Sequence, residues 1–304
     1  MAGNDLRHHG LDVERNPLAA DATTGGPPEQ QQDWPGRERE MQPRADHGEH
    51  SYKGGGKLEG LCALITGGDS GIGRDVAIAF AREGADVAIS YIEEHEDARE
   101  TVRWVEEAGR RGLAIAGDVR DPEFGSGAVA RTVDELGDLN ILVNNASTHF
   151  EIDAVEDVTP EQLDQVFRTN VGGYVYTTQA ALRHLEAGDV IINTGSVVAM
   201  AGHGSLFDYA ASKAAERNLT RSLALKLAER GIRVNCVAPG PVWTPLIPGT
   251  RSPESVAHHG ANAFWKRPAQ PAEIAPSYVF LASTDSRYYT GEILAPTGFT
   301  TTSR

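Results

Sequence analysis

Short apolar runs alternate with amphipathic segments from residue 58 onward, and this alternation limits the fold more than any other feature of the chain. The runs are apolar throughout, which is typical of strands that a parallel sheet buries on both faces. The segments between them carry apolar residues at helical spacing and end near glycines such as Gly84 and Gly231. The predicted strands are residues 61–66, 86–91, 113–116, 139–143, 190–193, 232–237 and 292–294. The predicted helices are residues 71–83, 94–109, 122–136, 159–186, 209–230 and 271–281.

This order of strands and helices indicates βαβ units, so the predicted fold class is α/β. We expect a doubly wound parallel sheet with helices on both faces. Ligands of such sheets bind where the carboxyl ends of the strands meet, so the residues after each strand are the candidates for chemistry. The length of 304 residues allows one such domain over residues 58–304.

Residues 1–57 are rich in Gln, Pro, Gly and charge, and no strand or helix period persists in them. We predict an N-terminal arm that is either disordered or extended, because this composition buries too little apolar surface to fold alone. In the extended alternative, Trp34, Met41 and Tyr52 are the candidate anchors on a neighbouring surface. We expect Trp34 and Met41 to anchor the arm on a neighbouring subunit. Residues 53–57 are predicted to form a flexible hinge into the domain.

The formal charge of −15 disfavours binding to nucleic acid, whose phosphates an acidic surface repels. No apolar run approaches the roughly 20 residues of a membrane span, and the N-terminus lacks a signal-peptide pattern. Cys62 and Cys236 are too few for a disulfide scaffold, and the histidines show no metal-ligand spacing. We therefore expect a cytoplasmic protein with no metal, nucleic-acid or membrane partner.

A glycine-rich loop, Gly67 to Gly73, separates the first predicted strand from the first predicted helix. Glycines allow a tight turn and let the backbone approach a pyrophosphate, while the helix N-terminus attracts its negative charge. The spacing Gly67, Gly71, Gly73 differs from G-x-G-x-x-G, and a glycine-rich turn alone is a weak signal. Its place after the first strand of a βαβ series favours nucleotide binding.

Tyr209 and Lys213 lie four residues apart, so they share one face of the predicted helix 209–230. A tyrosine ordinarily has a pKa of about 10, which a nearby ammonium lowers. Such a pair can act as a general acid/base, although the spacing alone more often describes a surface tyrosine beside a solvated lysine.

Several further motifs accompany this pair. They are Asp118 after the third strand, Asn144-Asn145-Ala146 after the fourth, Asn170 in the long helix, Ser196 after the fifth strand and Pro239-Gly240-Pro241-Val242 after the sixth. In this order and spacing the sequence resembles the short-chain dehydrogenase/reductase family over about residues 58 to 298. The arm and Asp69-Ser70-Gly71-Ile72 resemble a bacterial branch with an N-terminal extension, which includes general-stress-protein-like oxidoreductases. The resemblance implies a Rossmann-type fold and hydride exchange between a nicotinamide dinucleotide and a carbonyl or secondary alcohol.

The resemblance also implies residue roles. Tyr209 exchanges the proton, Lys213 favours its ionisation and holds the nicotinamide ribose, Ser196 hydrogen-bonds the substrate oxygen, and Asn170 positions a water. The implied cofactor-binding residues are Gly67, Asp69, Ser70, Gly71, Ile72, Gly73, Tyr91, Asp118, Val119, Asn145, Ala146, Tyr209, Lys213, Pro239, Gly240, Val242 and Thr244. The candidate substrate-pocket residues are Ser147, His149, Val198 and Trp243, and Thr244 to Phe264 is expected to form a mobile lid.

Cofactor choice rests on the end of the second strand, where an acidic residue would select NAD. Tyr91 stands there, and Ser70 stands where an NADP-binding arginine is common. Asp69 would repel a 2′-phosphate and Arg74 would offset this, so we expect NAD to be favoured without excluding NADP. Family members pair through two long helices, here 159–186 and 209–230, which implies a homotetramer. A nucleotide-binding sensor without catalysis is the alternative, and the complete Asn-Ser-Tyr-Lys set weighs against it.

Overall fold

A computed structural model describes residues 21–299. Seven parallel strands form one sheet in the order β3-β2-β1-β4-β5-β6-β7, the doubly wound arrangement expected from the sequence. The strands are β1 (Cys62–Thr66), β2 (Asp86–Tyr91), β3 (Gly112–Ala116), β4 (Ile141–Asn144), β5 (Val190–Thr194), β6 (Arg233–Val237) and β7 (Ile293–Leu294). The order reverses between β1 and β4, where the carboxyl ends of the strands open a crevice for a ligand.

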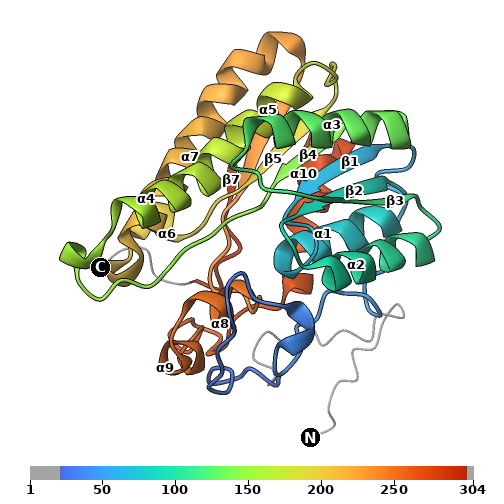
Figure 1. Cartoon of the computed structure of the whole chain (residues 1–304). Coiled ribbons are helices and arrows are strands. Elements are labelled where there is room, and N and C mark those ends of the chain that lie inside the picture. Colours follow the sequence, from blue (N-terminus) through green and yellow to red (C-terminus); the bar gives the residue numbers. More distant parts are fainter. Residues whose placement is uncertain (1–20, 300–304) are drawn as a thin grey trace, which may run out of the picture.

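Helices cover both faces of the sheet (Figure 1). On one face α1 (Gly71–Arg82) packs against α2 (His95–Glu107) and α10 (Ala275–Ala282). On the other, α3 (Pro122–Leu136) packs against α5 (Gly173–Ala181), and α4 (Pro160–Phe167) against α7 (Phe207–Leu227). Each face has its own apolar core, since alternate residues of β1 such as Ile65 and Leu64 belong to different clusters.

The long helix expected over residues 159–186 is wrong as a single element. A π-helical turn, Arg168–Gly172, separates α4 from α5, and the helix ends at Ala181. The turn contains Asn170, whose side chain is held by hydrogen bonds to Thr148 and Ser212. Turns of this kind inside helices re-aim backbone groups and occur often at functional sites. The helical periodicity of the sequence carries no signal for one extra residue in a turn.

The arm from residue 21 to residue 57 lies against its own domain, beside α8 (Leu246–Thr250) and α9 (Pro253–Ala257) (Figure 1). Met41 is buried in a cluster with Trp243, Ile247 and Val256. The Trp243 indole Nε1 donates to the Pro43 carbonyl at 2.8 Å. The expectation that Met41 and Trp34 anchor the arm on a neighbouring subunit is therefore corrected, because both contact this chain.

The segment expected to be a flexible hinge, residues 53–57, is tied to the end of α1. One carboxylate, that of Glu83, accepts hydrogen bonds from the Tyr52 hydroxyl at 2.6 Å, the Gly55 amide at 2.8 Å and the Lys57 amide at 3.0 Å. These bonds hold the pKa of Glu83 below its ordinary value although burial opposes them. The glycines supply the backbone freedom that lets two amides reach one side chain.

Candidate active site

The loop between β1 and α1 has a shape that only glycine allows at two positions. Gly67 has φ of +62°, and a Cβ there would lie 3.0 Å from the Ala146 Cα. A Cβ on Gly73 would lie 1.9 Å from the Gly67 carbonyl oxygen. The loop therefore closes tightly on itself and on the end of β4, and its backbone is open to a ligand above it.

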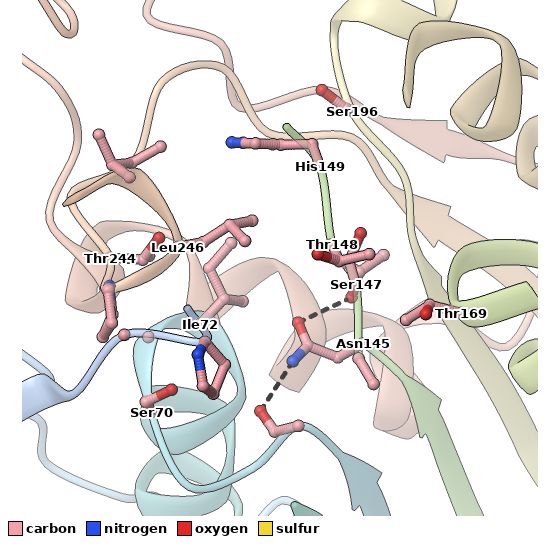
Figure 2. A pocket seen from close by; sticks show the side chains of 18 of the residues that line it. Ser70, Ile72, Asn145, Ser147, Thr148, His149, Thr169, Ser196, Thr244 and Leu246 are labelled. Carbon is pink, nitrogen blue, oxygen red and sulfur yellow. Dashed lines mark hydrogen bonds between the residues drawn. The ribbon is translucent and has the colours of Figure 1, made fainter. Parts of the chain in front are cut away.

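A cavity of about 370 Å³ opens above this loop, at the carboxyl ends of the strands. Figure 2 shows Ser70 and Ile72 at the start of α1, with Ser147, His149 and Thr244 around the same space. Most of the predicted cofactor-binding residues line it: Gly67, Asp69, Ser70, Gly71, Ile72, Tyr91, Asp118, Val119, Asn145, Ala146, Tyr209, Lys213, Pro239, Gly240, Val242 and Thr244. Ser196 and the predicted substrate residues Ser147, His149 and Val198 line it as well.

Three predicted residues, Gly73, Trp243 and Asn170, do not line the cavity. Gly73 lies below the loop against Gly67, where it has a packing role. Trp243 is fully buried and faces Met41 of the arm, so its assignment to the substrate pocket is corrected. The sequence analysis did not predict that the arm packs on the domain and covers Trp243. The position of Trp243 after β6 does not indicate which way its side chain points.

Tyr209 and Lys213 project from α7 into the cavity. The Lys213 ammonium is buried, lies 5.5 Å from the centre of the Tyr209 ring and donates to the Thr194 carbonyl at 2.9 Å. The His149 ring meets the Tyr209 ring edge-on at 5.0 Å between centres. Ser196 lies after β5, and its hydroxyl accepts from the Val198 amide at 3.4 Å.

Asn170 lies behind the cavity wall and is fully buried. Its amide nitrogen donates to the Thr148 carbonyl at 3.0 Å and the Ser212 hydroxyl at 2.9 Å, and its oxygen accepts from the Thr148 amide and the Ser147 hydroxyl. The side chain thus joins the π-helical turn to the loop after β4 and to α7. Any contact of Asn170 with a water in the site must use its main chain, because its side-chain groups already have partners.

Asn145 ties the glycine loop to the strands on either side. Its side-chain nitrogen donates to the Thr66 and Gly67 carbonyls at 3.1 and 3.0 Å, and its oxygen accepts from the Thr194 hydroxyl at 3.2 Å. This fixes the loop from β4 and explains why an amide, with donors and an acceptor, stands there.

The side of the cavity beside the end of β2 is acidic. Asp69 and Glu94 line it, and burial raises the pKa of Asp69 to about 7, with Glu94 adding to the rise. Arg74, expected to offset Asp69, is buried and does not line the cavity: its Nε donates to the Asp69 carbonyl and the Thr101 hydroxyl. Its charge lowers the pKa of Asp69 but does not overcome the effect of burial. Its charge is committed to α2 rather than to a ligand.

The wall around Tyr209 contains groups that the sequence did not reveal. The Arg251 guanidinium and the Trp34 indole line the cavity, and the Trp34 Nε1 donates to the Thr148 hydroxyl at 3.0 Å. His149 is buried with no hydrogen-bond partner on either ring nitrogen within the described part of the chain, and burial holds its pKa well below the ordinary value. No sequence signal pointed to Arg251, and Trp34 was foreseen only as an anchor.

Comparison with known proteins identifies the family of the chain. The family model described as enoyl-(acyl carrier protein) reductase matches residues 67–298. General stress protein 39 of Bacillus subtilis is 49% identical over 90% of this chain and 95% of its own. The carrot protein named glucose and ribitol dehydrogenase is 45% identical over 90% and 96%. The chain belongs to the short-chain dehydrogenase/reductase family.

Solved short-chain dehydrogenases share the fold. One from Burkholderia cenocepacia in complex with NADP has a TM-score of 0.75 and 35% identity, covering 80% of this chain and 98% of that one. One from Mycobacterium paratuberculosis bound to NAD has a TM-score of 0.73 and 34% identity, with the same coverage. The protein is an NAD(P)-dependent short-chain dehydrogenase/reductase of the branch that resembles the Bacillus stress proteins. Among residues 21–299 no helix is long and apolar enough to cross a membrane, and no cluster of potential metal ligands occurs.

Proposed function

We propose that the protein interconverts a small carbonyl compound and the corresponding alcohol, with Tyr209 as the acid/base. The observation that carries this proposal is that Tyr209, Lys213 and Ser196 line one cavity with the glycine loop. The loop fits a dinucleotide because its backbone, kept compact by the glycines at 67 and 73, lines the cavity at the start of α1. The nicotinamide, when bound, supplies or accepts the hydride.

The protein residues supply the proton and the orientation. Tyr209 donates its phenolic proton to the substrate oxygen in reduction and takes it back in oxidation. Lys213 favours the phenolate by its positive charge and offers its remaining N–H to a ribose hydroxyl. The Ser196 hydroxyl hydrogen-bonds the same substrate oxygen and stabilises the charge that develops on it. Asn170 joins the π-helical turn to α7 at Ser212, next in sequence to Lys213, and leaves its main chain to hold water.

For the dinucleotide we favour NAD. Asp69 and Glu94 flank the end of β2, and no cation occurs among Ser90, Tyr91 and Ile92 there. A 2′-phosphate would meet negative charge at this edge of the site. Solved relatives are bound to NADP in one case and to NAD in another, so our preference for NAD rests on these residues.

For the substrate we favour a small oxygen-bearing compound that contacts Ser147, His149 and Val198. The name of the carrot relative makes polyols and sugars the first candidates. Two buried free cysteines fit a reducing cytoplasmic setting.

We further propose a homotetramer paired through α4–α5 and α7. Leu163 on α4 and Leu225 on α7 expose 41% and 83% of their surface in the single chain.

The test is turnover on a panel of aldehydes, ketones, polyols and aldoses, each with NADH, NADPH, NAD and NADP. We expect reduction of at least one aldehyde and a clear preference between dinucleotides. Tight dinucleotide binding without turnover on any compound in either direction would favour the sensor alternative.

A further inference from the structure

A buried ion pair joins Lys213 to Glu216, three residues later on α7. The Lys213 Nζ lies 2.9 and 3.0 Å from the two carboxylate oxygens, and both side chains are at most 1% exposed. The same ammonium donates to the Thr194 carbonyl at 2.9 Å. An ammonium has three N–H groups, so two fixed acceptors leave one for a ligand.

The other titratable groups near Glu216 come from three further elements. They are Tyr174 on α5, Cys236 on β6 and Tyr278 on α10, with Arg217 next in sequence on α7. Burial raises the pKa of Tyr174, Cys236 and Tyr278, so all three are neutral at physiological pH. Lys213 is therefore the direct counter-ion of this carboxylate.

The charge of the pair depends on pH. Burial raises the pKa of Glu216 to about 8, and the attraction of Lys213 opposes the rise. A neutral Glu216 leaves the Lys213 charge uncompensated, whereas an ionised Glu216 cancels much of it. The other groups that face Tyr209 are His149, which burial keeps neutral, and Arg251, whose charge Glu151 partly balances at 3.8 Å.

We propose that Glu216 is a positioning residue of the active site, which fixes the Lys213 ammonium and sets how strongly its charge favours the phenolate of Tyr209. This deepens the proposed function, on which its consequence for turnover rests. The carboxylate holds the ammonium from the side away from the cavity, since Glu216 itself does not line it. Removing the carboxylate takes away the negative charge that cancels much of the Lys213 charge, so the phenolate beside the ammonium forms more readily.

The test follows the phenolate of Tyr209 by absorbance at 295 nm during a pH titration of the full-length protein. Subtracting the same titration of a Tyr209→Phe protein isolates this one tyrosine and requires neither substrate nor dinucleotide. In Glu216→Gln, which keeps the size and a hydrogen-bond acceptor, we expect the midpoint to fall by about one pH unit or more. Glu216→Met, of similar volume and without an acceptor, should move it in the same direction.

Binding of NAD and of NADP provides a second readout, by quenching of tryptophan fluorescence. Glu216→Gln should bind both dinucleotides nearly as the wild type does, because the amide oxygen still receives the Lys213 N–H. Glu216→Met should bind both several-fold more weakly, because the ammonium has lost one of its fixed partners.

Asp75→Asn is the matched control. Asp75 is an equally buried carboxylate on α1 that accepts from the Ala275 amide, and its replacement should leave the Tyr209 midpoint unchanged. An unmoved midpoint in both Glu216 variants, or an equal shift in Asp75→Asn, would overturn the inference. Reduced melting temperature with an unmoved midpoint would give Glu216 a structural role only. Absence of turnover on every substrate would contradict the proposed function. The titration would still decide the role of Glu216, because it requires no turnover.

Discussion

The proposed proton transfer depends on a single side chain, that of Tyr209. In Tyr209→Phe the ring remains and the hydroxyl is lost, so we expect turnover to fall about 10²–10⁴-fold with little change in dinucleotide affinity. Ser196→Ala should also lower turnover and spare affinity, whereas Lys213→Ala should weaken both. Steady-state rates and fluorescence titration of the three variants provide the measurement. Full turnover in Tyr209→Phe would remove the phenol from the mechanism.

Dinucleotide preference should depend on pH through Asp69. Its pKa of about 7 means that the carboxylate is charged above neutral pH and protonated below it. Repulsion of a 2′-phosphate is thus present at high pH and lost as the pH falls, so the affinity for NADP should rise from pH 8 to pH 6. Asp69→Asn should bind NADP more tightly at pH 8 and abolish most of this dependence.

Affinity for NAD, which lacks the phosphate, is the internal control for the Asp69 prediction and should change little over the same range. A wild-type protein that strongly prefers NADP at pH 8 would contradict the argument. The phosphate would then be held by the Ser90 and Tyr91 hydroxyls.

At the scale of single residues, two sequence patterns pointed to residues of the cavity: positions directly after strands and the spacing of side chains on a helix. Residues of the glycine loop and Ser196 were predicted from their positions after strands, and Tyr209 and Lys213 from their spacing on a helix. Ser196, Tyr209, Lys213 and most of the loop line the cavity. Glu216 was within reach, because it shares a helix face with Lys213. The sequence could not predict that Arg251 lines the cavity or which way Trp243 points, because both depend on where the loop after β6 and the arm pack.

Among the elements, the hydrogen-bonded join between the arm and α1 should respond to acid. Because the folded-state pKa of Glu83 is lowered, its contribution to stability is complete above the ordinary value of 4.5 and lost as the pH falls through the folded-state value. Glu83→Gln should cost about 1–3 kcal/mol at pH 7, since the amide cannot accept all three hydrogen bonds. Urea unfolding of both proteins from pH 7 to pH 4 should show this difference shrinking below about pH 4.5. A difference that stays constant would assign the loss to packing.

The arm is also an element of the core, through Met41. This side chain is 2% exposed in the cluster with Trp243, so Met41→Ala should destabilise the protein by about 2–5 kcal/mol. Thermal and urea unfolding measure the loss. Met41→Leu, which conserves volume, is the control and should cost less than about 1.5 kcal/mol. Equal stability of Met41→Ala and wild type would mean that the arm is detached in solution.

Element boundaries show where sequence reasoning stops. The expected strands coincide with the observed ones to within a residue or two, because burial on both faces leaves a continuous apolar run. The sequence did not predict the break in the helix at Arg168–Gly172, because that break is set by hydrogen bonds of Asn170 to distant residues. The sequence did not predict that the arm packs on its own domain, because the few apolar side chains of the arm gain burial only against α8 and α9.

At the scale of the whole molecule, assembly should depend on the exposed apolar face of α7. Leu225→Glu places a charge on this face and should convert the expected tetramer to smaller species, as measured by light scattering after size exclusion. Val155→Glu is the control, because Val155 is 67% exposed and lies outside α4, α5 and α7. This substitution should leave the size of the assembly unchanged. A monomeric wild type, or an unaltered tetramer in Leu225→Glu, would contradict pairing through these helices.

The docked arm has a consequence for synthesis on the ribosome. Pro43 is made 200 residues before Trp243, whose indole binds its carbonyl, and Trp34 is made 114 residues before Thr148. At about 5–20 residues per second, Pro43 waits roughly 10–40 s for Trp243 to emerge. During that interval Met41 and Trp34 are open to chaperones and proteases, although the glycine loop and the first strands are already complete. The arm is thus translated before the segments on which it packs and is among the last to find its place, and its Trp34 lines the wall of the cavity when it does.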